Sequence, residues 1–148
     1  MAANVNQPLY TVEILRLAAS IPHLGRLPAP HGKADARSAT CGSEVTVEVT
    51  LDSEGRVAEL RQEVQACAFG QASAAVMGLS AVGRTAAEVE QALGEFAGWL
   101  DAKRDNPGAW PGLAALAPAR FRRARHGAML LPFRALLGAI DDAAGRQS

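Results

Sequence analysis

The stretch Val45-Thr46-Val47-Glu48-Val49-Thr50-Leu51 alternates strictly between apolar and polar residues. This period of two predicts a β-strand with one buried face. The next residues, Asp52-Ser53-Glu54-Gly55, are typical of a turn, and the segment 56–66 is expected to return as a second strand. On that second strand the expected inward face carries Ala58, Leu60, Val64 and Ala66. Because a two-stranded hairpin alone is only marginally stable, residues 34–39 are expected to add a third strand.

Helical signals lie on both sides of this hairpin. Thr11 can cap a helix that ends before Pro22, and residues 71–79 are rich in Ala and Met with no strand pattern. Thr85-Ala86-Ala87-Glu88 is a capping box, and apolar residues follow it at helical spacing. A last helix is expected over 118–143, with Pro132 inside it. The sequence therefore predicts an α+β fold, in which helices pack on one side of a small antiparallel three-stranded sheet.

Length and composition indicate one compact domain over 1–148, with a core of about 9–143. Lys+Arg and Asp+Glu number 15 each, so the formal net charge is zero and nothing global attracts the chain to nucleic acid or to an anionic membrane. The longest apolar stretch, 128–140, is too short to span a bilayer and is interrupted by Pro132 and Arg134. The N-terminus lacks a cationic start followed by an apolar run, so no secretion signal is expected. We expect a cytoplasmic protein with reduced thiols.

The chain has two cysteines, Cys41 and Cys67, and the predicted hairpin lies between them. Because the hairpin folds back on itself, both thiols are expected near the same end of the sheet. Cys67 comes just before a predicted helix, where the helix dipole favours a thiolate as metal ligand and nucleophile. By count alone, two cysteines allow one disulfide, two inert buried thiols, or half of a four-ligand site.

Both cysteines lie in recognisable local motifs. The first motif reads Cys41-Gly42-Ser43, and the second reads Ala66-Cys67-Ala68-Phe69-Gly70-Gln71-Ala72-Ser73. Three further segments complete this set of motifs: Gly83-Arg84-Thr85, the segment 125–136, and the opening Leu9-Tyr10-Thr11 with Gly25. Through these residues the chain resembles the IscU/NifU/SufU-type scaffolds on which iron–sulfur clusters are assembled, from residue 9 to about 140. The resemblance implies an IscU/NifU N-terminal-like fold.

Two positions depart from the family pattern. The family aspartate after Cys-Gly is Ser43 here, and the third family cysteine, on the late helix, corresponds to Ala128. Glu44 neighbours the aspartate position but should project to the opposite face of an extended chain. His126 lies close to the missing cysteine and is a candidate metal ligand, although one or two helical positions rotate a side chain by at least ~100°. The two remaining histidines, His23 and His31, lie in a loop rich in proline and are weaker candidates.

The resemblance implies a scaffold, without substrate turnover of its own, that binds iron and sulfide through Cys41 and Cys67. A [2Fe–2S] cluster usually takes four protein ligands, which a symmetric dimer would supply as four thiolates. Its implied partners are a cysteine desulfurase as sulfur donor and recipient apoproteins. The alternative is a diverged scaffold that relays sulfur, binds a partner, or holds zinc through two thiolates and non-thiolate ligands.

Other chemistries have little support in the sequence. No Gly-x-Gly-x-x-Gly, phosphate-binding Gly-Lys-Ser/Thr loop or cysteine-protease pattern is present. Four arginines, Arg120, Arg122, Arg123 and Arg125, invite a nucleic-acid interpretation, but aromatic residues make up only 5% of the chain and no stacking platform accompanies them. We interpret these arginines as a solvated helix face that could contact an acidic partner.

Overall fold

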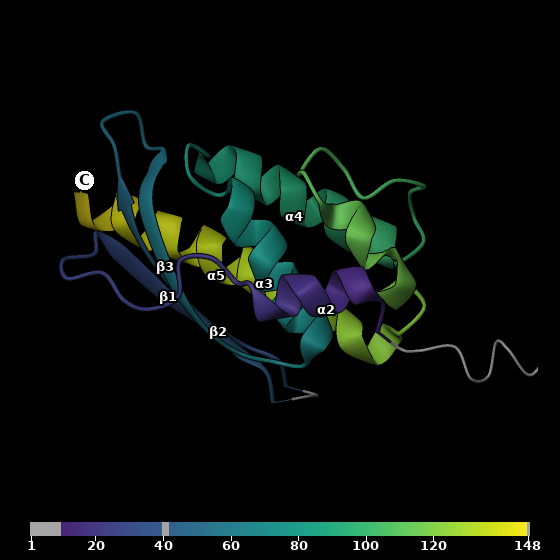
Figure 1. Cartoon of the computed structure of the whole chain (residues 1–148). Coiled ribbons are helices and arrows are strands. Elements are labelled where there is room, and N and C mark those ends of the chain that lie inside the picture. Colours follow the sequence, from purple (N-terminus) through teal and green to yellow (C-terminus); the bar gives the residue numbers. More distant parts are fainter. Residues whose placement is uncertain (1–9, 40–41, 148) are drawn as a thin grey trace, which may run out of the picture.

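Helices cover one face of a three-stranded antiparallel sheet (Figure 1), as the sequence predicts. The computed structural model describes residues 10–39 and 42–147. In chain order the elements are α2 (Val12–Ala19), β1 (Gly32–Arg37), β2 (Glu44–Leu51), β3 (Val57–Gln65), α3 (Ala68–Ser80), α4 (Ala86–Leu100), the 3-10 helix η1 (Leu113–Ala119) and α5 (Arg123–Gln147). None of the described helices is both long and apolar enough to cross a membrane.

The sheet is a meander in the order β1-β2-β3. Val45, Val47 and Val49 of β2 are fully buried, as the alternation predicts. The prediction for the second strand was wrong at Ala58, which is exposed, while Val57 is buried. A bulge is the reason: the register shifts between Thr50 and Leu51, so that Val57 rather than Ala58 lies opposite Leu51.

The other face of the sheet carries the polar residues of β2 and is crossed by the loop 21–31. Glu48 is only 5% exposed because its carboxylate lies under this loop and accepts the Leu27 backbone N–H at 2.7 Å. The loop also pairs with β3, since Gly25 N–H donates to the Gln62 carbonyl at 3.0 Å. The Gly25 hydrogen bond thus covers the outer edge of β3 at Gln62, whereas the Glu48 contact lies on the face of the sheet.

Helix α5 lies along the inner face of the sheet and contacts β1, β2, α3 and α4. Aromatic rings fill the space between these helices: Phe133 of α5 contacts Phe96 of α4 and Trp110, both edge to face. The indole N–H of Trp110 donates to the Val76 carbonyl of α3 at 3.1 Å. The buried apolar side chains of the sheet and helices form one cluster.

The expected single helix over 118–143 was wrong at its start. The chain instead forms the 3-10 helix η1, a turn, and then α5 from Arg123. In that turn the Arg120 guanidinium donates to the Trp99 carbonyl at 2.7 Å and to the Arg104 carbonyl at 2.8 Å. These bonds satisfy carbonyls at and beyond the end of α4, an interaction that local sequence patterns do not report. Pro132 does lie inside α5, as predicted.

Candidate functional site

Cys67 lies at the junction of β3 and α3, where it is the N-cap residue of the helix. Its thiol is half-buried and makes no capping hydrogen bond to the first turn of α3. The first N–H groups of a helix have no partner within the helix, and the helix dipole is positive there. The thiol therefore lies where negative charge is favoured.

The hairpin brings the residues that follow Cys41 close to Cys67. Cys41 itself lies outside the described residues. Glu44 at the start of β2 pairs with Gln65 at the end of β3. An open hollow of about 340 Å³ is consequently lined from both chain segments, by Gly42, Ser43, Gln65, Ala66, Cys67 and Gln71.

Two glutamines of this hollow were missed by sequence reasoning. Gln71 comes four residues after Cys67, so it lies one helical turn further along the same side of α3. That spacing was a signal the sequence offered. Gln65 could be placed only once the end of β3 was known. Both amides provide donors and acceptors beside the thiol, but neither is a ligand that a soft metal prefers.

The position of the family aspartate holds no carboxylate. Ser43 is 4% exposed, and its backbone carbonyl accepts the Ser38 N–H at 2.9 Å. Glu44 forms an ion pair with Arg37 at 3.0 Å and lines a separate hollow over the outer face of the sheet. Glu44 therefore points away from Cys67, as the alternation predicts. None of the described residues that line the Cys67 hollow is acidic.

Ala128, the counterpart of the third cysteine, is fully buried in α5 beside the first turn of α3. A Cβ atom placed on Gly70 would lie 3.4 Å from the Ala128 Cβ atom and 3.3 Å from its carbonyl oxygen. The Ser73 hydroxyl donates to the Met129 carbonyl at 2.5 Å, which fixes the two helices against each other. The fold thus places residue 128 near the start of α3, but its methyl group offers no ligand atom.

The candidate histidines lie in other contacts. The His126 Nε2 atom is 2.8 Å from the Arg120 carbonyl oxygen. Because a carbonyl only accepts, Nε2 carries the proton in this contact. His31 Nδ1 accepts the Leu51 N–H at 3.0 Å, at the other end of β2, and His23 is exposed in the loop. Within residues 10–39 and 42–147, no group of three or more His, Cys, Asp or Glu side chains is placed to hold a metal ion.

The arginines between η1 and the first turn of α5 do not act as one group. Arg120 is held by two carbonyls and lies over the Trp99 ring at 5.2 Å from its centroid, so it serves the fold. Arg122 and Arg123 are exposed, and neither forms a salt bridge within the described part of the chain. Only the exposed arginines are consistent with a solvated surface.

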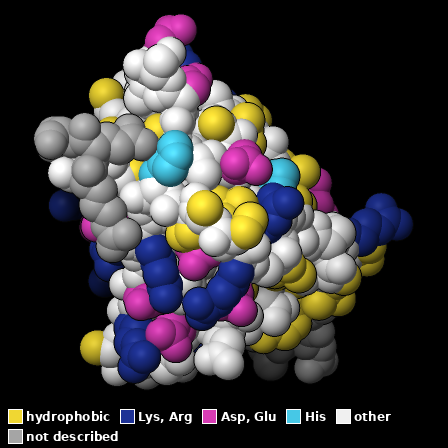
Figure 2. Space-filling view, turned by 90° about the vertical axis from the view of Figure 1, so that its left-hand side faces the viewer, with side chains coloured by type: hydrophobic (Ala, Val, Ile, Leu, Met, Phe, Trp, Pro, Cys, Tyr) yellow, Lys and Arg dark blue, Asp and Glu magenta, His cyan; other side chains and the backbone are white. Residues whose placement is uncertain are grey.

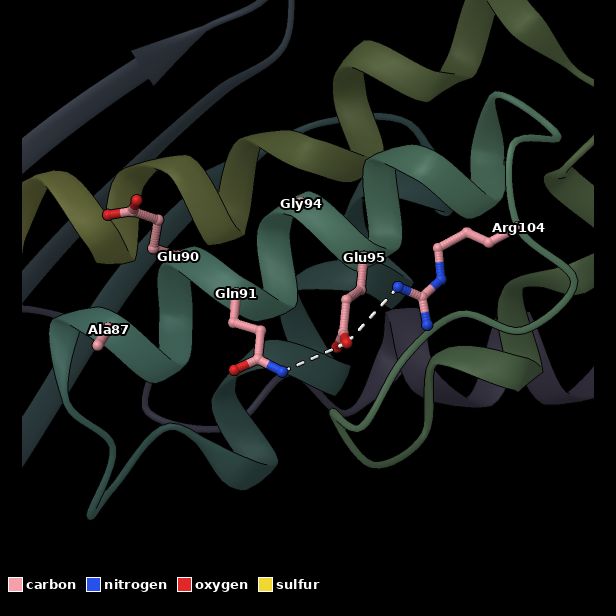
Figure 3. Close-up of a pocket in the computed structure, with 6 residues that line it drawn as sticks. All are labelled: Ala87, Glu90, Gln91, Gly94, Glu95 and Arg104. Carbon is pink, nitrogen blue, oxygen red and sulfur yellow. Dashed lines mark hydrogen bonds and ion pairs between the residues drawn. The ribbon is translucent and has the colours of Figure 1, made fainter.

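A second hollow lies on the outer side of α4, around Glu95 (Figure 3). The Glu95 carboxylate accepts the backbone N–H of Ala109 at 3.2 Å and the side-chain amide of Gln91 at 3.4 Å, and it lies 3.6 Å from Arg104. The hydrogen bond from Ala109 has the largest effect on the pKa of Glu95 and lowers it below its ordinary value. The hydrogen bond from Gln91 lowers this pKa further. The carboxylate therefore anchors the loop that follows α4. Among the described residues that line this hollow, Glu90 is the only other carboxylate, and no histidine or cysteine accompanies it.

Comparisons with known proteins agree with this fold. The family model for the NifU-like N-terminal domain matches residues 9–95. Among solved structures, a nitrogen-fixing NifU-like protein (N-terminal) from Brucella abortus is 33% identical, with a TM-score of 0.86 over 93% of this chain and 95% of that chain. A candidate iron–sulfur cluster assembly scaffold protein for the SUF system of Fervidobacterium islandicum AW-1 is 21% identical, with a TM-score of 0.81 over 89% of this chain and 96% of that chain. No curated protein sequence matches this chain.

Proposed function

Because the chain belongs to the family of NifU-like N-terminal domains, which are scaffolds for iron–sulfur cluster assembly, we propose that it binds iron and sulfide through Cys41 and Cys67. One observation carries the proposal. Cys67 occupies the N-cap position of α3, but its thiol makes no hydrogen bond to the first turn of the helix. It lies in an open hollow that Gly42 and Ser43 also line. A thiol in that position is accessible and lies where negative charge is favoured.

The number of ligands decides how a cluster would be held. A [2Fe–2S] cluster usually takes four protein ligands, and this chain offers two thiols. Ser43 supplies no carboxylate, and the methyl group of Ala128 supplies no sulfur. We therefore propose that two copies of the chain each contribute Cys41 and Cys67 to one cluster. The cluster is cargo, supplied with sulfur by a cysteine desulfurase and passed to recipient apoproteins in the cytoplasm, without turnover of a substrate.

Anaerobic reconstitution tests this function. The purified chain is incubated with iron, sulfide and thiol, and its visible spectrum and bound iron are measured. The variants Cys41→Ser and Cys67→Ser are treated and measured in the same way. We expect a charge-transfer band with about one iron per chain in the wild type, lost in both variants. Gln65→Ala, which changes the lining of the same hollow but keeps both thiols, should load like the wild type.

A colourless, iron-free wild type would refute cluster binding when a three-cysteine scaffold loads under the same conditions. Adding Ser43→Asp and Ala128→Cys together then tests whether the rest of the site is intact. Cluster loading by this double variant would show that only the two ligands are missing. Zinc found by elemental analysis in the colourless protein would instead indicate a zinc site.

The buried methyl group of Ala128 favours a second candidate function, a sulfur relay without cluster assembly. In this function the Cys67 thiolate attacks the terminal sulfur of a persulfide on the desulfurase. A new S–S bond forms at Cys67, the S–S bond of the donor breaks, and the donor cysteine leaves as thiolate. Mass spectrometry after incubation with a desulfurase and cysteine should then show one added sulfur atom on the wild type and none on Cys67→Ser.

A further inference from the structure

The second half of β1 presents backbone groups that point out of the sheet. β1 is an edge strand, and the Ser38 N–H donates to the Ser43 carbonyl at 2.9 Å, in register with the β1–β2 pairs. In an antiparallel pair, every second residue exchanges hydrogen bonds with the partner strand. The even-numbered residues of β1 therefore bond to β2, and Lys33, Asp35 and Arg37 direct their N–H and C=O groups outward. The Lys33 N–H confirms this direction, because it donates to the Asp142 carboxylate of α5 at 2.9 Å.

That carboxylate covers only the first part of the edge. Asp35 and Arg37 are exposed, and no other strand of the described chain lies beside β1. The opposite edge of the sheet is covered, since Gln62 of β3 exchanges backbone hydrogen bonds with the loop that contains His23 and Gly25. The outward groups of Asp35 and Arg37 thus form the open edge of this sheet, and an open edge is a template for an added strand.

The charges on this edge are self-complementary. Asp35 accepts a hydrogen bond from the Thr46 hydroxyl at 2.5 Å, and Arg37 pairs with Glu44 at 3.0 Å, so both side chains lie on the outer face of the sheet. Figure 2 shows a side of the molecule on which Lys and Arg side chains are interspersed with Asp and Glu. If a second β1 lies antiparallel with the two-fold axis at Ala36, each Asp35 faces an Arg37 of the other copy. A pairing centred on Asp35 instead places two like charges opposite each other, which is unfavourable.

We propose that this edge, residues 35–37, pairs with the same edge of a second copy about a two-fold axis at Ala36. The pairing extends the two sheets into one and satisfies the outward N–H and C=O groups of Asp35 and Arg37 in both copies. It rests on neither metal nor cysteine. The paired residues 35–37 include neither cysteine, and Cys67 follows β3 at the other edge of the sheet. This interface therefore differs from one in which two copies share a cluster.

Charge-reversal variants test the pairing by sedimentation of the metal-free protein. Asp35→Arg alone and Arg37→Asp alone each place like charges opposite each other, and each should weaken self-association by about tenfold or more. The double variant, Asp35→Arg with Arg37→Asp, restores opposite charges and should associate like the wild type. A mixture of the two single variants should form a hetero-pair, because one carries Arg at both positions and the other Asp.

A backbone test accompanies the charge test. Arg37→Pro removes an outward N–H while leaving the β1–β2 hydrogen bonds intact, so it should abolish pairing but keep the thermal unfolding transition. A wild type that stays monomeric up to ~1 mM, a range that covers weak association, would overturn the proposal. Single variants that associate like the wild type would also overturn it, as would a mixture without hetero-pairs. All of these readouts use metal-free protein, so their failure leaves the cluster proposal untouched.

Discussion

Replacing Gly32 by alanine should strongly destabilise the protein, because Gly32 is where α5 crosses β1. A Cβ atom at Gly32 would lie 2.2 Å from the Ala139 carbonyl oxygen and 2.4 Å from the Ala143 nitrogen, while real Cβ atoms essentially never approach within 3.0 Å. Both contacts are with backbone atoms of α5, so no side-chain rotation relieves them. Overpacking of this kind costs about 1–3 kcal/mol, and the immobile neighbours place Gly32→Ala at about 3 kcal/mol.

Urea unfolding followed by circular dichroism measures this loss. Gly94→Ala is the matched control, since Gly94 is exposed on α4 and a Cβ there meets nothing within 4 Å. Because alanine is the better helix former, Gly94→Ala should raise the free energy of unfolding by about 1 kcal/mol. Surface substitutions usually change the free energy of unfolding by no more than about 0.5 kcal/mol. If the free energy of unfolding of Gly32→Ala lies within that range of the wild-type value, then the close crossing of α5 over β1 is wrong.

Three further substitutions test the helix contacts. Ser73→Ala removes a buried hydroxyl bonded to the Met129 carbonyl and should cost about 1–2 kcal/mol of unfolding free energy in urea. Thr85→Ala removes the N-cap side chain of α4 and should lower the free energy of unfolding by about 1 kcal/mol. The pKa of Glu95 lies below its ordinary value of 4.5, chiefly because the carboxylate accepts the Ala109 N–H. The stability from this ionised group is present above pH 4.5 and is lost as the pH falls below it, so Glu95→Gln should flatten the decline of the melting temperature on acidification.

Each of these predictions has a result that contradicts it. An unchanged unfolding free energy for Ser73→Ala would mean that the α3–α5 contact does not depend on this hydroxyl. For the capping box, Ser53→Ala in the exposed β2–β3 turn is the control, and an equal loss in both variants would contradict a specific cap. A Glu95→Gln variant whose melting temperature declines as steeply as that of the wild type would show that other carboxylates govern the acid response.

Local patterns correctly predicted the parts of the fold whose interactions lie within a few residues. The alternation of 45–51 matches β2, and Thr85 and Glu88 form the expected reciprocal cap of α4. The third strand was inferred from the need of a hairpin for a neighbour, and β1 is found at Gly32–Arg37. The position of Cys67 before a helix also followed from the sequence, because the strand pattern ends there.

Contacts between distant segments decided the rest. The bulge that turns Ala58 outward and the bonds that hold Arg120 in a turn both depend on neighbours outside their own segments. The same holds for Ala128, whose place beside Gly70 depends on how α5 packs against α3. The sequence by itself determined the strands, the caps and the two thiols. Only the tertiary structure decided which side chains surround Cys67 and which edge of the sheet stays open, because packing places residues that no short spacing in the chain relates.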